Sequence, residues 1–257
     1  MTIIVTADKI IIIMTRVLIF AFLSGFSLIL GTIIGTALKI PQKVIAAIMA
    51  FGSGVMICAL TFGLMEEAFK HGGFDAVIIG FLVGGLVFIL GDFLIHRFGG
   101  RTSKRRKRFI KTARETNGKA IVLGALLDGI PESVALGISL LSKNGIGLLM
   151  AAAIFLSNFP ESISSIDDLK KEGFSKKRIY FIWSTVGIIV MATAVLSYLF
   201  LKKLNLNALG IIESFASGAI LAMLADSMMP EAYEEGGYLI GILTVLGFLT
   251  AFILFKI

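Results

Sequence analysis

The sequence predicts an all-α membrane protein, a bundle of eight transmembrane helices that forms one domain over residues 1–257. Composition is the first reason: hydrophobic residues make up 57% of the chain and charged residues 16%, against about 45–50% and about 25% in soluble domains. The second is the mean hydropathy of +0.95. The third is that the apolar residues gather into stretches long enough to cross a bilayer, which takes about 20 residues.

Apolar stretches that end at glycine, proline or charged clusters predict the helices in order. The first residues are mixed, with Asp8, Lys9 and Arg16, and do not form a convincing cleavable signal peptide. We therefore expect the first helix to be retained. The eight predicted helices cover residues 17–38, 43–67, 74–97, 118–142, 145–169, 178–202, 207–230 and 236–256.

Basic residues in the loops predict the orientation. They gather in the segment 98–117, in the segment 170–178 and near Lys39 and Lys43, and these three loops lie on one side of the predicted bundle. By the positive-inside rule that side is cytoplasmic, so both termini of this multi-pass protein are expected outside the plasma membrane. Two loops dissent: Lys202 and Lys203 would lie outside, and Glu231, Glu234 and Glu235 would lie inside without a Lys or Arg. Their weight is small, because the other loops hold many more basic residues and acidic residues count little in this rule. The basic segment 98–117 could instead bind anionic lipid head groups.

Other classes of function find little support. The net charge of +7 and pI of about 9.5 could suggest nucleic-acid binding, but the loops account for the excess, so no nucleic-acid partner is expected. Cys58 is the only cysteine, which excludes an intrachain disulfide and a cysteine-based metal cluster. His71 and His96 fall near predicted helix ends and are expected to be interfacial side chains.

An internal repeat is visible between residues 51–73 and 215–237, which align without gaps. The two segments belong to the second and seventh predicted helices, which cross the membrane in opposite senses. Related segments of opposite topology indicate an inverted repeat, a common plan of secondary transporters. The first three helices would then pair with the last three, and the fourth and fifth would lie between them. Identical positions include Ser53 and Ser217, Glu67 and Glu231, and Gly73 and Gly237.

Two proline–glutamate pairs lie inside these two central helices. The segments read Asp-Gly-Ile-Pro-Glu-Ser (128–133) and Ser-Asn-Phe-Pro-Glu-Ser (157–162). A charged side chain in hydrocarbon is unfavourable, so an intramembrane carboxylate indicates a functional site. Asp128 and Glu132 are four residues apart and share one helical face, as do Ser157 and Glu161.

Each proline also frees a backbone acceptor. Pro131 and Pro160 lack an N–H, so the carbonyls of Leu127 and Leu156 lose their helical donors. Such carbonyls need another partner inside a membrane, such as a hydroxyl, a water or a cation. Two neighbouring carboxylates repel unless a proton or a cation intervenes, which favours a divalent metal site or a metal–proton exchange. The alternative is that the glutamates only hydrogen-bond within the bundle.

These motifs resemble those of the ZIP metal-ion transporters, which carry His-Asn-x-Pro-Glu-Gly on the fourth helix and a similar motif on the fifth. The resemblance extends over nearly the whole chain. It includes eight helices with both ends outside, a charged loop after the third helix, Ser53-Gly-Val-Met56 on the second helix and Pro230-Glu231-Ala232 on the seventh. The resemblance implies a metal site between the fourth and fifth helices, whose residues here are Asp128, Glu132, Ser157, Asn158, Glu161 and Met56.

This chain departs from the family pattern where imidazole is expected. Asp128 and Ser157 stand at the two histidine positions, and Gly129 replaces the asparagine of the fourth helix. The sixth helix also lacks the glutamate that many family members supply, so we expect one metal rather than two. An oxygen-rich site suits harder ions, whereas imidazole favours zinc. The hypothesis is a preference shifted from zinc toward manganese or iron.

The sequence therefore predicts transport of a divalent metal ion toward the cytoplasm, with zinc, manganese and iron as candidates. The metal is a substrate, no cofactor is expected, and no enzymatic activity is assigned. The partners are the metal ion and the lipid bilayer, and a homodimer remains open. The alternatives are a metal-sensing or scaffolding relative and, less favoured, an intramembrane enzyme that uses the paired acids. Four acids are expected along the ion pathway, at Glu66, Glu67, Asp226 and Glu231.

Overall fold

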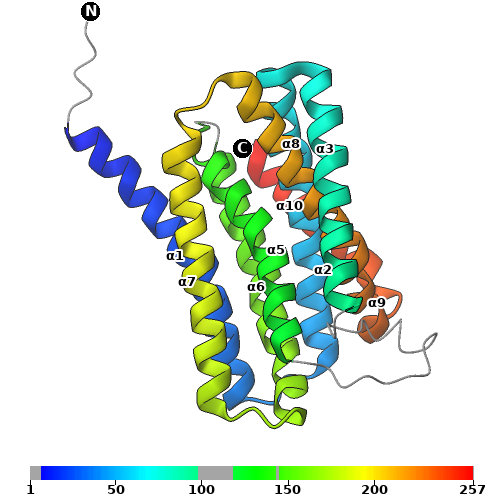
Figure 1. Ribbon diagram of the computed structural model, residues 1–257. Coiled ribbons are helices and arrows are strands. Elements are labelled where there is room, and N and C mark those ends of the chain that lie inside the picture. The colour runs from blue at the N-terminus through cyan, green and yellow to red at the C-terminus, as the bar shows by residue number, and fades with distance from the viewer. Residues whose placement is uncertain (1–6, 98–117, 143–144, 257) are drawn as a thin grey trace, which may run out of the picture.

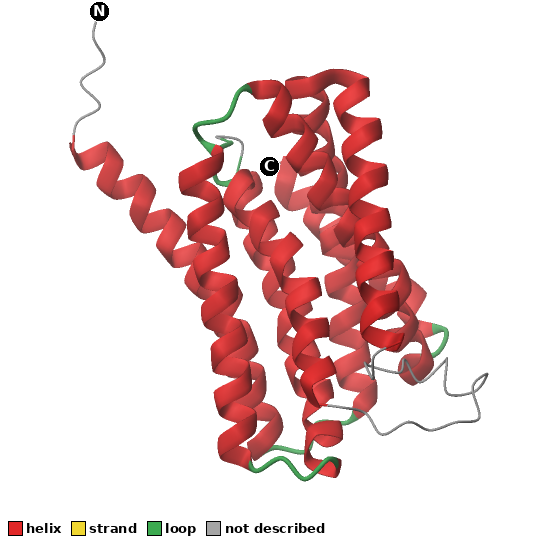
Figure 2. Ribbon diagram, viewed as in Figure 1, coloured by secondary structure: helices red, strands yellow, loops and turns green. Residues whose placement is uncertain are grey.

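The structure is a computed structural model that describes residues 7–97, 118–142 and 145–256. Within these residues every regular element is a helix and there is no strand (Figure 2). The basic segment 98–117 lies outside the described residues, so the prediction made for it stays a prediction.

The helices run up and down in one bundle (Figure 1). Two turns in the described part of the chain are π-helical and are labelled η1 and η2. In chain order the elements are α1 (Ala7–Ala37), α2 (Gln42–Ala59), η1 (Leu60–Met65), α3 (Glu66–Arg97), α5 (Gly118–Ser139), α6 (Ile146–Lys171), α7 (Lys176–Leu201), α8 (Leu206–Met223), η2 (Leu224–Met228), α9 (Met229–Gly236) and α10 (Leu239–Lys256).

Among the residues that the structure describes, seven helical stretches are long and apolar enough to cross a membrane, which makes the chain a membrane protein. One of them, Gln42–Ile95, contains 54 residues. A helix of this length would extend about 80 Å, far more than the roughly 30 Å of a bilayer core. The backbone leaves helical geometry inside it at Gly73, with φ 65° and ψ −164°.

The repeated segments share unusual backbone features. A π-helical turn covers Leu60–Met65 in the first segment and Leu224–Met228 in the second. Each segment then ends at a glycine with positive φ, Gly73 at 65° and Gly237 at 64°. Pro230 follows η2 closely, but Glu66 occupies the matching place after η1. Proline is therefore not required for the π-helical turn.

Helix packing follows the same correspondence. α2 packs on α10, and α8 packs on α3. Gly54 and Gly218 occupy matching positions, and a Cβ at either would collide with a carbonyl oxygen of the facing helix, that of Thr244 or of Phe81. Gly247 and Gly84 make the reciprocal close approaches, to the carbonyls of Phe51 and Phe215. Small residues thus let these backbones touch, as is common between membrane helices.

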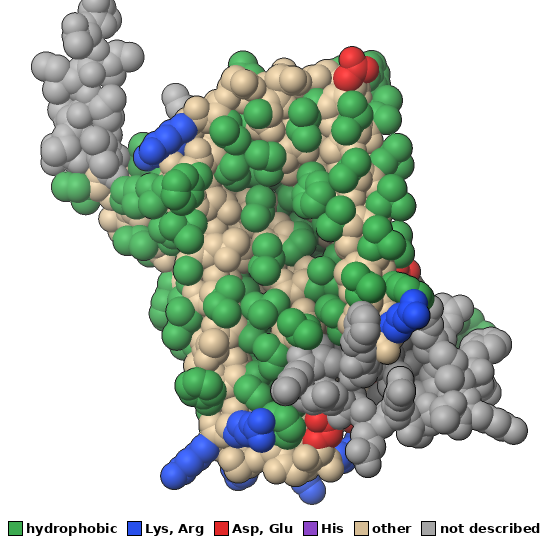
Figure 3. Space-filling view, in the orientation of Figure 1, with side chains coloured by type: hydrophobic (Ala, Val, Ile, Leu, Met, Phe, Trp, Pro, Cys, Tyr) green, Lys and Arg blue, Asp and Glu red, His purple; other side chains and the backbone are tan. Residues whose placement is uncertain are grey.

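The remaining helices, α1, α5, α6 and α7, pack against one another and against the two pairs just described. α1 packs on α6 and α7, while α5 packs on α7 and α8. On the face drawn in Figure 3, hydrophobic side chains cover the middle of the molecule. Most of the Lys and Arg side chains on that face gather at the end that holds the turn between α6 and α7. This distribution fits an apolar belt in contact with lipid.

Helix boundaries differ from the predictions mainly at the first helix. α1 begins at Ala7 instead of residue 17 and includes Arg16. Hydropathy detects the membrane-spanning part of a helix, and polar residues such as Asp8 and Lys9 do not stop the helix itself.

The helices α7 and α8 each begin at a side-chain cap. The Ser175 hydroxyl accepts a hydrogen bond from the Arg178 N–H, and the Asn205 side chain accepts one from the Ala208 N–H.

Candidate functional site

The two proline–glutamate segments lie inside continuous helices. Pro131 is within α5 and Pro160 within α6, and neither ends its helix. The Leu156 carbonyl, which Pro160 cannot pair with, lies against α2. A Cβ added at Gly52 would come within 2.9 Å of that carbonyl oxygen. The absence of a side chain at Gly52 therefore lets α2 cover this part of α6.

One small cavity brings together residues from both central helices. Asp128 of α5 and Ser157 and Glu161 of α6 line it, together with Glu231 of α9. Its volume is about 20 Å³, which is room for one water-sized particle. The rest of the lining comes from α2, α8 and η2, through Met49, Met223, Ser227 and Met228. Three predicted metal-site residues and one predicted pathway residue thus share one space.

Glu132 is buried beside this cavity, with 0% of its surface exposed. Neither of its carboxylate oxygens makes a well-formed hydrogen bond within the described chain. Its electrostatic neighbours are Glu161, Ser157 and Asp128. The Ser157 hydroxyl alone compensates poorly for a buried negative charge beside two other acids, so a proton or a cation would stabilise Glu132.

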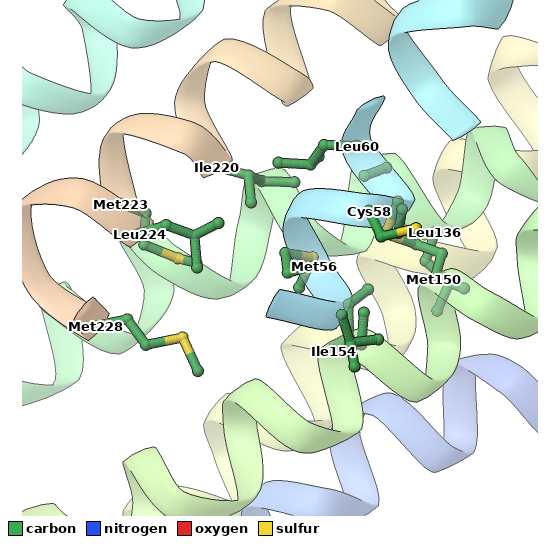
Figure 4. Packing of buried hydrophobic residues seen from close by; sticks show 14 of the residues in the cluster. Met56, Cys58, Leu60, Leu136, Met150, Ile154, Ile220, Met223, Leu224 and Met228 are labelled. Carbon is green, nitrogen blue, oxygen red and sulfur yellow. The ribbon is translucent and has the colours of Figure 1, made fainter. Parts of the chain in front are cut away.

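The Met228 thioether lies against Ser157, the first residue of the motif on α6. The Ser157 hydroxyl donates to Met228 Sδ at 3.7 Å, and Met228 is 5% exposed. In Figure 4 the side chains of Met223 and Met228 both project from the α8–η2 segment into the packed interior. The sequence analysis did not identify these methionines, nor Met49, because methionine is ordinary in an apolar helix.

Besides Glu132, two more predicted ligands, Asn158 and Met56, lie outside the lining of the cavity. The Asn158 amide donates from Nδ2 to the Ser24 carbonyl at 3.2 Å, which ties α6 to α1. Met56 is fully buried among hydrophobic side chains, including Ile154 and Leu224 (Figure 4). Their assignment to the metal site stays a prediction.

Gly129 of α5, at the position where the ZIP motif has asparagine, packs against α7. A Cβ at Gly129 would come within 2.9 Å of Val190 Cγ2, and Val190 is fully buried. The Gly129 carbonyl also accepts a hydrogen bond from the Ser133 hydroxyl at 2.6 Å. This side of the site is therefore filled by an aliphatic side chain and a helix-internal hydrogen bond.

The predicted pathway acids have different surroundings. Glu66 and Glu67 both form ion pairs with Lys70, at 2.8 Å and 3.1 Å. Glu231 lines the cavity, whereas Asp226 is exposed on η2 and is not part of the lining. Among the four, only Glu231 is placed with the proline–glutamate residues.

A buried acid that sequence reasoning missed lies near the middle of α8, away from the cavity. Glu213 is 3% exposed and its Oε2 is 2.8 Å from Nδ1 of His71 on α3. The two residues are 142 positions apart. The repeat aligns only the later part of α8, and Glu213 lies just before it, so no sequence signal paired these residues. His71 is half-buried and joins two helices, a more specific role than the interfacial one expected.

The described residues contain no group of three or more His, Cys, Asp or Glu side chains arranged to hold a metal ion. The acids of the cavity therefore do not make a complete ligand set by themselves. Serine hydroxyls and methionine thioethers are the other electron donors of its lining. Any ion in this cavity would have to use some of them or keep water.

Comparison with known proteins gives one distant relative. A protein of Arabidopsis thaliana named "Putative zinc transporter" is 25% identical over 185 residues. The match covers 71% of this chain and 29% of the relative, so the chain spans less than a third of that protein's length. No family model matches the chain.

Proposed function

We propose that this chain transports a divalent metal ion across the membrane, toward the side of its basic loops, in the manner of a ZIP transporter. One observation carries the proposal: Asp128, Ser157, Glu161 and Glu231 converge on a cavity the size of a single ion or water. The fully buried carboxylate of Glu132, whose oxygens make no well-formed hydrogen bond within the described residues, lies beside it. Buried carboxylates in this arrangement call for a cation.

The relative named as a zinc transporter supports the same reaction class. It also favours transport over the intramembrane enzyme. Zinc, manganese and iron all remain candidate substrates of the proposed site.

The proposal includes eight membrane crossings arranged as an inverted repeat. Supporting observations are the matching π-helical turns, the break at Gly73 with its counterpart at Gly237, and the reciprocal glycine contacts of α2 with α10 and of α3 with α8. In such an arrangement one group of helices rocks or slides against the other around a central site. α5 and α6 would then carry the site, with α9 supplying Glu231 at one opening.

A second candidate is a metal sensor or scaffold with the same fold. The incomplete set of acidic and histidine ligands in the described residues favours it. Such a protein would bind metal without moving it. Flux measurements separate the two functions.

The test is metal flux into proteoliposomes that contain the purified protein and a trapped metal-sensitive dye. We expect uptake of Zn²⁺, Mn²⁺ or Fe²⁺ by the unaltered protein, and its loss in Glu132→Gln and in Glu161→Gln. Glu213→Gln is the matched control, since it alters a buried carboxylate away from the cavity and keeps a hydrogen-bonding partner for His71. Metal binding without flux of any of the three ions would favour the sensor instead.

A further inference from the structure

The cavity between α6 and η2 is lined by sulfur as well as oxygen. Met49, Met223 and Met228 all contribute to its wall, and each is no more than 5% exposed. Sequence reasoning predicted donors that were mostly oxygen, with Met56 as the single thioether. The structure instead gathers three other methionines around the acids.

Met228 is the methionine with a defined orientation toward the site. Its Sδ accepts the hydrogen bond of the Ser157 hydroxyl at 3.7 Å. Ser157 stands where the family pattern has histidine on this helix. Met228 also closes the π-helical turn η2, and both it and Ser227 line the cavity. π-helical turns often occur at functional sites because the extra residue redirects neighbouring side chains.

The size of the cavity restricts how an ion can be held. The space that water-sized particles can occupy is about 20 Å³, and one water needs roughly 10–15 Å³. An ion bound against the lining would therefore exchange part of its hydration shell for protein donors. Mg²⁺ gives up water reluctantly, and Mn²⁺ prefers carboxylate and water, whereas thioethers bind softer ions such as zinc.

We infer that Met228 is a metal ligand that supplies the soft donor in place of the missing imidazole at Ser157, and that the cavity therefore selects Zn²⁺ over Mn²⁺ and Mg²⁺. The inference rests on the proposed function and names the substrate class of that site. It reverses the preference for harder ions that the sequence alone predicted.

The direct test is X-ray absorption at the zinc edge of zinc-loaded purified protein. Cys58→Ala serves as the parent, because Cys58 is the only thiol and its removal leaves methionine as the only source of sulfur. We expect a sulfur scatterer in the first shell of the parent, and its loss in the Met228→Leu variant. The matched control is Met150→Leu, a fully buried methionine of the same core that does not line the cavity. Met-to-Leu changes conserve volume and are well tolerated in cores.

The second measurement is the ratio of Zn²⁺ to Mn²⁺ uptake by proteoliposomes. We expect Met228→Leu to lower this ratio several-fold, through slower zinc uptake with manganese uptake unchanged or faster. Met150→Leu is expected to leave the ratio as in the parent.

The outcomes separate this inference from the proposed function. A parent without a sulfur scatterer, or a Met228→Leu variant with an unchanged uptake ratio, would overturn the inference while leaving transport intact. Zinc bound through sulfur without flux of any metal would uphold the ligand and overturn transport. Loss of both readouts in Met150→Leu as well would show a general packing effect and also overturn the inference.

Discussion

At the scale of single residues, the pair of His71 and Glu213 gives a direct prediction about stability. Glu213 is 3% exposed and lies 2.8 Å from the imidazole. Replacement of His71 by alanine leaves this carboxylate buried without its partner, so we expect the protein to lose about 1–3 kcal/mol of stability. Thermal unfolding in detergent would show this as a lower midpoint.

A double-mutant cycle with Glu213→Ala isolates the interaction. If the two residues stabilise the fold as a pair, the double variant should be less destabilised than the sum of the single variants. Simple additivity would mean that the interaction between His71 and Glu213 contributes nothing to stability.

Individual site residues differed in how well the sequence could predict them. Asp128, Glu132 and Glu161 were identifiable because a carboxylate is conspicuous in an apolar stretch. Met228 and Glu213 were not, since thioethers are common in such helices and the partner of Glu213 is far away in sequence. The sequence alone reveals a charged residue in an apolar stretch. Which residues surround it is known only from the fold.

At the scale of helices, the glycines with positive φ control where the chain turns. Gly73 has φ 65° and ψ −164°, and Gly237 has φ 64° and ψ −144°. These backbone conformations are nearly restricted to glycine, and no atom lies within 4 Å of a Cβ added at either position. We expect Gly73→Ala and Gly237→Ala each to cost about 1–3 kcal/mol through backbone strain alone.

Thermal unfolding of each variant is the measurement. Gly241→Ala provides the control, because this helical glycine also has open space around its Cβ position but has no positive φ. A loss of stability in Gly241→Ala equal to that of the other two would rule out the strain argument.

Close helix packing makes a separate prediction for α10. A Cβ at Gly247 would collide with the carbonyl oxygen of Phe51 on α2. Gly247→Ala must therefore push the two helices apart, and we expect a lower yield of folded protein and a reduced unfolding temperature. Gly241→Ala, one to two turns earlier in the same helix, should behave as the unaltered protein, because alanine is the better helix former where space is free.

The helical elements themselves were largely predictable from hydropathy. Each predicted apolar stretch overlaps an observed helix, because a bilayer requires both the length and the composition. The π-helical turns at Leu60–Met65 and Leu224–Met228 were not predictable. They form with and without a neighbouring proline, so local sequence does not explain them. We infer that packing against other helices produces these π-helical turns, and a hydropathy pattern carries no information on such packing.

For the whole molecule, the proposed topology can be tested with introduced cysteines. Cys58 is the only native cysteine, so Cys58→Ala gives a parent without thiols. In that parent we expect Phe74→Cys and Lys203→Cys to react from outside the cell with a membrane-impermeant maleimide. Tyr238→Cys should react only after permeabilisation. Phe74 and Tyr238 are 70% and 90% exposed, so a labelling reagent can reach both.

The reactivity at residue 74 distinguishes the possible numbers of crossings. If Gln42–Ile95 crossed the membrane once, this residue would lie within lipid and remain unlabelled. Labelling of all three positions from the same side would contradict the inverted arrangement.

The reciprocal glycine contacts also have a mechanical consequence. Where backbone touches backbone, as between Gly247 and Phe51 or between Gly84 and Phe215, no flexible side chain can absorb a displacement. The pairs α2–α10 and α3–α8 should each move as a rigid unit, so movement is expected where these pairs contact the helices that carry Asp128 and Glu161. Cross-links within one pair should then leave transport unchanged, whereas cross-links from a pair to α5 or α6 should stop it.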